Sequence, residues 1–169
     1  MEEIESPVEH LSEELHHAAE HAKESWLKFA ALLSALLAVL AAISGMQSGH
    51  EVNAAMIYQI RASDAWGYYQ AKGIKTMIVE SQAQTPATIA QARKYAAEQQ
   101  DIKADAESKA AASERHLHGH EILARAMTLF QVAIAMTAIA VLARLRRFLL
   151  VAAGLGCGGI GFFIQYWLM

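Results

Sequence analysis

The chain has 169 residues, a formal net charge of -3 and an apolar content of 54%, which is high for a water-soluble domain of this length. So slight an acidity gives no reason to expect nucleic-acid binding. Because Cys157 is the only cysteine, an intrachain disulfide and a cysteine-based metal site are both excluded.

The first segment, residues 1–25, is acidic and rich in histidine. On a helix, His17 and His21 would lie one turn apart on the same face, a spacing that can hold a transition metal. A solvated amphipathic segment is the simpler interpretation of the same pattern. We therefore treat this pair only as an alternative metal site.

Three apolar stretches occupy residues 26–45, 122–142 and 148–169. Each is close to the ~20 residues that a helix needs to cross a ~30 Å hydrocarbon core. None of them has a charged residue at its centre. The sequence therefore predicts an all-α integral membrane protein with three transmembrane helices.

Residues 46–121, between the first two spans, predict a long helical hairpin with its turn near 84–88. Thr85 suits an N-cap and Pro86 suits a first helical turn. In the first helix, spacings of three and four alternate as in a coiled coil, along Ile57, Ile60, Asp64, Gly67, Ala71, Ile74 and Ile78. The second helix has a weaker seam of Ile89, Ala92, Ala96, Gln99, Ile102 and Ala106. Since alanines bury little area, we expect another copy or another protein to cover the pair.

Asp64 stands inside the first of these seams. A carboxylate buried there needs a cationic partner. Folding the hairpin about its turn brings Lys109 close, so we predict a structural ion pair between Asp64 and Lys109. Arg61 and Lys103 are alternative partners, and a proton-handling or ligand-binding role for Asp64 is the minor interpretation.

A group of histidines and acids flanks the outer ends of the first two spans. It comprises His50, Glu51, His116, His120 and Glu121. A hairpin that turns near Pro86 brings these residues together, and imidazole with carboxylate suits a divalent transition metal such as zinc. Histidine also titrates near neutral pH, which would let the group respond to protons. The simpler alternative is a polar collar at the membrane surface.

The short loop at residues 143–147 contains three arginines, and Lys23 and Lys28 flank the start of the first span. Basic residues in short loops mark the cytoplasmic side of a membrane. We therefore expect a multi-pass membrane protein with a cytoplasmic N-terminus, and the family resemblance described below implies that the membrane is the bacterial inner membrane. The hairpin and the C-terminus would then be periplasmic.

Small residues spaced by four recur in two of the spans, where they allow close packing between helices. The first span contributes Ala38 and Gly45, and the third contributes Gly154, Gly158 and Gly161. We expect these residues to pack the helices of a homo-oligomer.

Two stretches carry a resemblance to a known family. They are residues 61–75 (RASDAWGYYQAKGIK) and residues 118–134 (HGHEILARAMTLFQVAI). The chain resembles, over nearly its whole length, the bacterial membrane family catalogued as domain of unknown function 4337. The resemblance implies the three-span architecture, and it implies no established activity.

No nucleophile, base and orienting group occur together at a recognisable spacing, so we do not expect an enzyme. The pattern favours a membrane scaffold or accessory protein that forms a homo-oligomer or is a small subunit of a larger membrane complex. The alternative is an oligomeric channel, transporter or sensor that responds to a divalent metal or to protons through the His/Glu group. A divalent transition metal is the one cofactor that the sequence suggests.

Overall fold

The computed structural model describes residues 25–82 and 85–169, and this part of the chain consists of three helices and their connections. Helix α2 spans Ser25–Glu80 (56 residues), α3 spans Pro86–Leu142 (57 residues) and α4 spans Arg146–Trp167 (22 residues). All three are long and apolar enough to cross a membrane. The predicted all-α fold with a long helical hairpin is confirmed to this extent.

The chain divides into two compact units. The apolar unit contains the described residues up to His50 together with Gly119–Met169. The hairpin unit is Glu51–His118. Helices α2 and α3 are not interrupted at Gly45, Gly49 or Gly119, so each helix contributes to both units.

The start of α3 follows from local chemistry. The Thr85 N–H donates to the Thr88 hydroxyl at 2.9 Å, and the Thr88 N–H donates back to the Thr85 hydroxyl at 3.3 Å. This reciprocal cap satisfies donors that a helix N-terminus would otherwise leave unpaired, and Pro86 has no N–H to satisfy. The predicted N-cap and first turn are therefore confirmed.

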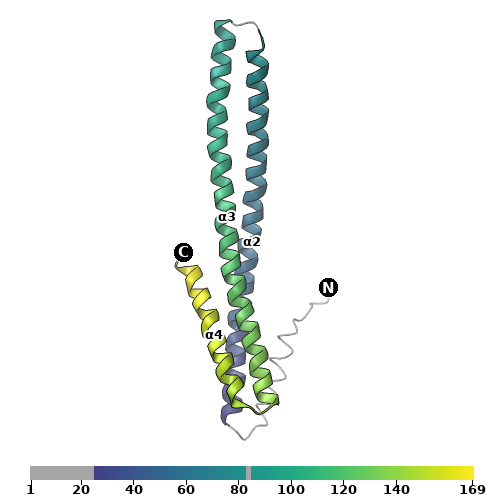
Figure 1. The fold of residues 1–169 in the computed structure, drawn as a ribbon, viewed down its shortest axis with the longest axis vertical. Helices are drawn as coiled ribbons and strands as arrows, with labels where there is room; N and C mark the ends of the chain where they lie inside the picture. The colour runs from purple at the N-terminus through teal and green to yellow at the C-terminus, as the bar shows by residue number, and fades with distance from the viewer. Residues whose placement is uncertain (1–24, 83–84) are drawn as a thin grey trace. The chain divides into compact units, whose positions relative to one another are not determined.

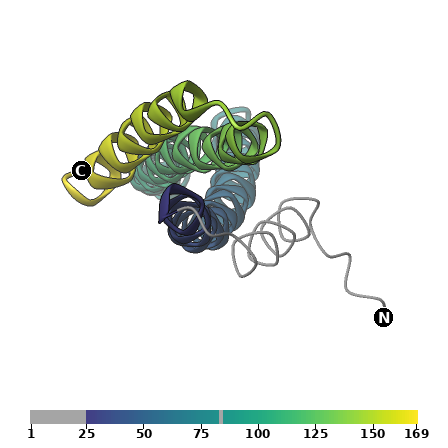
Figure 2. The ribbon, with the colours of Figure 1, turned by 90° about the horizontal axis from the view of Figure 1, so that it is seen from below.

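The core of the apolar unit forms where α2 and α3 meet. Its buried residues are Leu37 and Ala41 of α2 and Ala126, Phe130, Ala133 and Ile134 of α3. Helix α4 reaches this core through glycine, and Figure 2, which views the helices end on, shows α4 lying alongside α3. A Cβ added at Gly159 would lie 2.5 Å from Phe130, and one added at Gly156 would lie 2.9 Å from Leu37. Only glycine allows this close approach.

The connection from α3 to α4 is a tight turn. Arg144 adopts a positive φ of 52°, and Leu145 is extended immediately before α4 begins at Arg146. The Arg146 guanidinium lies 5.6 Å from the centre of the Trp26 ring, a cation–π contact that ties the start of α4 to the start of α2. The basic loop predicted at 143–147 is thus shorter than expected, because Arg146 and Arg147 already belong to α4.

In the hairpin unit, α2 and α3 lie side by side and run in opposite directions (Figure 1). Small residues line the contact: Ala55, Ala62 and Ala65 of α2 are buried, as are Ala106 and Ser113 of α3. The Ser113 hydroxyl donates to the Ala55 carbonyl at 2.8 Å, a distance that requires close backbones. The hairpin is therefore held by a narrow seam of alanine and serine.

The predicted first seam does not pack inside the hairpin. Its isoleucines are largely exposed: Ile57 by 49%, Ile60 by 61%, Ile74 by 54% and Ile78 by 52%. Asp64, Gly67 and Ala71 are exposed as well. Helix α2 carries a second series with the same spacing on its other side, and all its members are buried or half-buried: Ala55, Tyr58, Ala62, Ala65, Tyr69, Lys72, Thr76 and Val79. The alanines of this inner series let α3 approach closely. The isoleucines of this seam therefore lie on the side of α2 that α3 does not cover.

Candidate functional site

His116 and Glu51 form a pair in the hairpin unit. The Nδ1 atom of His116 lies 2.7 Å from Oε2 of Glu51, and the imidazole stacks on the Tyr58 ring with centroids 5.3 Å apart. The Glu51 side chain is mostly buried, which makes a hydrogen-bond partner necessary. When protonated, His116 would complete an ion pair across the two helices.

His120 has a separate partner in the apolar unit. Its Nδ1 atom lies 2.8 Å from the Ser48 hydroxyl oxygen and 3.1 Å from the Ser48 carbonyl oxygen. A carbonyl only accepts, so the second contact requires a proton on Nδ1. The Ser48 hydroxyl can then donate to the His120 carbonyl at 3.4 Å. This reciprocal bonding fixes both the ring and the local spacing of α2 and α3.

The predicted metal group is not assembled in the described part of the chain. Across residues 25–82 and 85–169, no three His, Cys, Asp or Glu side chains are placed to hold one metal ion. His50 is exposed, and Glu121 pairs instead with Arg125 one turn further along α3, at 3.7 Å. Nδ1 of His116 is engaged by Glu51, and Nδ1 of His120 is engaged by Ser48. His17 and His21 lie outside the described residues.

The predicted Asp64–Lys109 ion pair is also replaced by another. The Lys109 ammonium lies 2.5 Å from Asp105, one turn away on α3, while the Asp64 side chain is exposed. The prediction failed because Asp64 belongs to the outer face of α2 and needs no buried partner. Asp64 and Lys109 do share the lining of a shallow groove of about 510 Å³ with Arg61, Asp101 and Asp105.

A polar cluster that the sequence did not predict lies further along the hairpin unit. The Lys72 ammonium hydrogen-bonds to the Glu98 carboxylate and lies 4.8 Å and 5.7 Å from the ring centres of Tyr95 and Tyr68. The Lys72 side chain is only 11% exposed. Its hydrogen bond with Glu98 raises the pKa of Lys72, and the same bond lowers the pKa of Glu98. The available signal was a lysine on α2 that the folded hairpin brings opposite a glutamate of α3, next to the predicted α3 seam.

The small residues predicted to pack an oligomer have several fates. Ala38 packs against the core of its own chain, and a Cβ added at Gly45 would lie 3.1 Å from the sulfur of Met127. Gly158 lies near Leu129 of α3 at an ordinary contact distance. Gly154 and Gly161 face open space within the described chain. Close packing inside the chain uses Gly156 and Gly159 instead. The sequence could not single out these two, because all the glycines of this helix are chemically alike.

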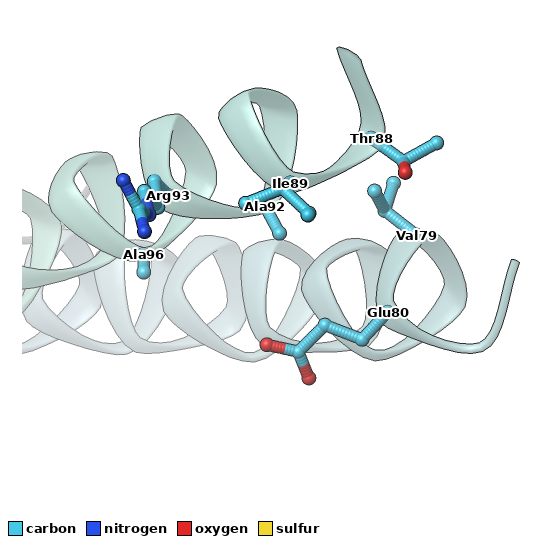
Figure 3. A pocket seen from close by; sticks show the side chains of 7 residues that line it. All are labelled: Val79, Glu80, Thr88, Ile89, Ala92, Arg93 and Ala96. Carbon is cyan, nitrogen blue, oxygen red and sulfur yellow. The ribbon is translucent and has the colours of Figure 1, made fainter. Parts of the chain in front are cut away.

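A small cavity of about 260 Å³ lies beside the turn between α2 and α3. Figure 3 shows its lining: Val79 points toward α3, whereas Glu80 points away from it. The remaining residues of the lining come from the first turns of α3, namely Thr88, Ile89, Ala92, Arg93 and Ala96. The lining combines apolar side chains with the charged groups of Glu80 and Arg93.

In the part of the chain that the structure describes, these features define an all-helical protein with three helices able to cross a membrane and a helical hairpin unit closed by small residues and paired polar groups. The family described as Domain of unknown function (DUF4337) matches residues 26–169. The chain belongs to this family, as the two sequence stretches predicted. Comparisons with curated proteins and with solved structures found no match.

Proposed function

We propose that the protein is a non-enzymatic membrane scaffold or accessory protein that assembles with itself or joins a larger membrane complex. Three helices with enough length and apolar character support the membrane location. Large apolar side chains on their surfaces, such as Leu32, Leu36 and Leu150, are exposed in the chain and suit contact with lipid.

The observation that carries the proposal is the apolar exposure of the hairpin unit. Ile57, Ile60, Ile74 and Ile78 are each about half exposed or more. If this unit projects into water, every 100 Å² of apolar surface left uncovered forgoes on the order of 2.5 kcal/mol. Exposed apolar rows of this kind mark surfaces that bind another protein.

The same proposal assigns the topology. Arg144, Arg146 and Arg147 are all exposed at the turn between α3 and α4. Basic residues in a short loop favour the cytoplasmic side of a membrane. This turn and the N-terminus would therefore lie on the cytoplasmic side of the bacterial inner membrane. The hairpin unit and the end of α4 would then be periplasmic.

The channel or sensor alternative depended on the five-residue His/Glu group, which the described residues do not assemble. Among the described residues of the apolar unit, the buried polar side chains are the hydroxyls of Ser34, Ser44, Ser48 and Thr137, which carry no charge. We therefore carry the scaffold forward as the single proposed function.

The oligomeric state of the full-length protein in mild detergent tests the proposal. Native mass measurement should give a multiple of the 18.4 kDa chain, or a defined complex with other membrane proteins when purified from its own membrane. A monomer under both conditions would contradict the scaffold.

A further inference from the structure

One end of the apolar unit carries a group of exposed cations. Arg144, Arg146 and Arg147 lie at the turn between α3 and α4, and Lys28 lies near the start of α2. All four side chains are exposed. The cation–π contact of Arg146 with Trp26 shows that the starts of α2 and α4 lie at the same end of the unit. We call the four cations the basic end.

The basic end has no acidic side chain near it within the described part of the apolar unit. Across residues 25–50 and 119–169, the acidic side chain is Glu121, which pairs with Arg125. Glu121 and Leu142, the last residue of α3, are separated by about 32 Å at the rise of an α-helix. This distance is several times the screening length of about 8 Å at physiological salt. Glu121 therefore does not neutralise the basic end.

Large apolar side chains lie directly beside these cations and are exposed as well. Leu142 and Leu145, on either side of Arg144, are 85% and 50% exposed. Leu150, one turn along α4 from Arg146, is 76% exposed. A soluble anion would satisfy the arginines and leave these leucines uncovered. A ligand that matches both kinds of side chain carries an anionic group and an apolar part in one molecule.

The length of α4 assigns its ends to the two surfaces of a bilayer, whichever way the chain is inserted. Its 22 residues span about 33 Å, close to the ~30 Å of a hydrocarbon core. Arg146 and Arg147 belong to its first turn. At its other end the Tyr166 hydroxyl accepts a hydrogen bond from Gln47 at 3.0 Å, and tyrosine favours a membrane surface. The basic end therefore lies at the level of the lipid headgroups, a step that rests on the membrane location in the proposed function.

We propose that the basic end binds the headgroup of an anionic phospholipid. The guanidinium groups of Arg144 and Arg147 donate to phosphate oxygens, which their planar arrangement of donors suits. Leu145 and Leu150 contact the upper part of the acyl chains. Arg146 is a positioning residue, because its contact with Trp26 holds α4 beside α2. A zwitterionic lipid binds less well, because its ammonium group is repelled by the same cations.

The backbone of Arg144 is consistent with a role for its side chain. Its φ of 52° lies in the left-handed region, which glycine adopts freely and other residues adopt at a cost. The side chain is exposed, so packing within the chain does not account for an arginine at this turn. Binding of a phosphate group does account for it.

The lipids that the full-length protein retains test the proposal. The protein is reconstituted in an equimolar mixture of phosphatidylglycerol and phosphatidylcholine, and the retained lipids are identified by native mass measurement in mild detergent. The wild type should retain several-fold more phosphatidylglycerol than phosphatidylcholine. Arg144→Gln combined with Arg147→Gln should bring this ratio close to one. Arg125→Gln is the matched control and should keep the wild-type ratio, since Arg125 is exposed in the same unit but lies next to Glu121.

Four results would overturn the lipid site. The first is equal retention of the two lipids by the wild type, and the second is an equal loss of selectivity in Arg125→Gln and in the double variant. The third is displacement of phosphatidylglycerol by inorganic phosphate at matched concentration, which would mean that the site recognises phosphate without the lipid. The fourth is an acidic protein that copurifies with the wild type and not with the double variant, without enrichment of either lipid.

Arg144→Gly separates lipid binding from folding. Glycine suits the positive φ, so the Tm in detergent should not fall, whereas the lipid ratio should fall at least twofold. A lower Tm with an unchanged ratio would show that Arg144 only shapes the turn and would refute its contact with lipid.

The oligomeric state of the same samples distinguishes failure of this inference from failure of the proposed function. An oligomer recovered from the membrane without lipid selectivity would refute the lipid site and leave the scaffold standing. A selective monomer that joins no complex would refute the scaffold and support the lipid site. A monomer recovered from the soluble fraction would refute both.

Discussion

At the scale of single residues, the paired polar groups decide how α2 and α3 are aligned. Glu51 with His116 and Lys72 with Glu98 each join the two helices of the hairpin unit. Alanine seams slide easily because their side chains are alike, whereas each of these pairs is satisfied in one alignment only. The Lys72–Glu98 pair also has a consequence that depends on pH.

Replacing Glu98 with Gln should make stability less sensitive to acid. The pKa of Glu98 is lowered in the folded chain, so its contribution is complete above the unfolded pKa of about 4.3 and disappears as the pH falls through the lower folded value. The pKa of Lys72 is raised in the folded chain, so its contribution to stability is complete below the unfolded pKa of about 10.4. That contribution is lost only as the pH rises through the higher folded pKa.

Thermal unfolding followed by circular dichroism at pH 7 and pH 3 measures this effect. The wild type should lose more in Tm on acidification than Glu98→Gln does. Glu107→Gln is the control, because Glu107 is exposed and lies 3.7 Å from Lys103 one turn away. The same acid sensitivity in Glu98→Gln and the wild type would contradict the prediction.

Gly159→Ala should destabilise the apolar unit. The new methyl group would lie 2.5 Å from a carbon of the fully buried Phe130 ring, so the ring or α4 would have to move. Overpacking of this kind costs about 1–3 kcal/mol. Gly154→Ala is the matched control, because nothing lies within 4 Å of its added Cβ. Unfolding in a graded series of denaturing detergent should separate the two variants, and equal stability would show that α4 is not held as described.

At the scale of elements, α2 is a helix with two seams. The inner seam contains three buried alanines, and the outer one contains four exposed isoleucines, although both follow the same spacing. Small side chains suit the partner that must come close, since they allow hydrogen bonds between side chain and backbone such as that from Ser113 to Ala55. A large side chain introduced into the inner seam should therefore destabilise the hairpin more than the same side chain introduced at an exposed position of α2.

Ala62→Leu should separate α2 from α3. Ala62 is buried in the inner seam of the hairpin unit, and a leucine there has no space. We expect a loss of about 1–3 kcal/mol in the stability of the hairpin. Gln59→Leu, one turn earlier on an exposed part of α2, should change stability by only about 0.5 kcal/mol. Protease resistance of the hairpin in the full-length protein measures the difference, and equal resistance would contradict the inner seam.

At the scale of the whole molecule, the proposed topology follows from where the charges lie along the chain. The three exposed arginines at the turn between α3 and α4 have no counterpart at the turn between α2 and α3, where Ser81 and Gln82 are the exposed residues of the α2 end. Retention of basic turns on the cytoplasmic side then directs the hairpin outward.

Cysteine labelling on intact cells tests this topology. In a Cys157→Ser background, Ser81→Cys should react with a membrane-impermeant maleimide from outside, because Ser81 is exposed at the end of α2. Leu145→Cys, also exposed, should react only after the membrane is permeabilised. The reverse pattern would mean that the chain is inserted in the opposite orientation.

Local chemistry in the sequence was sufficient for the helices and for the turn between α2 and α3. Runs of apolar residues predict spans, and Thr85 with Pro86 predicts the start of α3, because neighbouring residues alone decide these features. The two family stretches were likewise visible in the sequence.

Only the tertiary structure decided which residues meet. Two seams with one spacing lie on α2, and periodicity cannot say which of them packs against α3. The glycines of α4 are chemically identical, and only the position of Phe130 distinguishes Gly159 from Gly154. In the same way, the sequence grouped His116 with His120, but the structure gives His116 to Glu51 and His120 to Ser48. Each of these choices depends on distances between segments far apart in the chain, which a linear pattern does not contain.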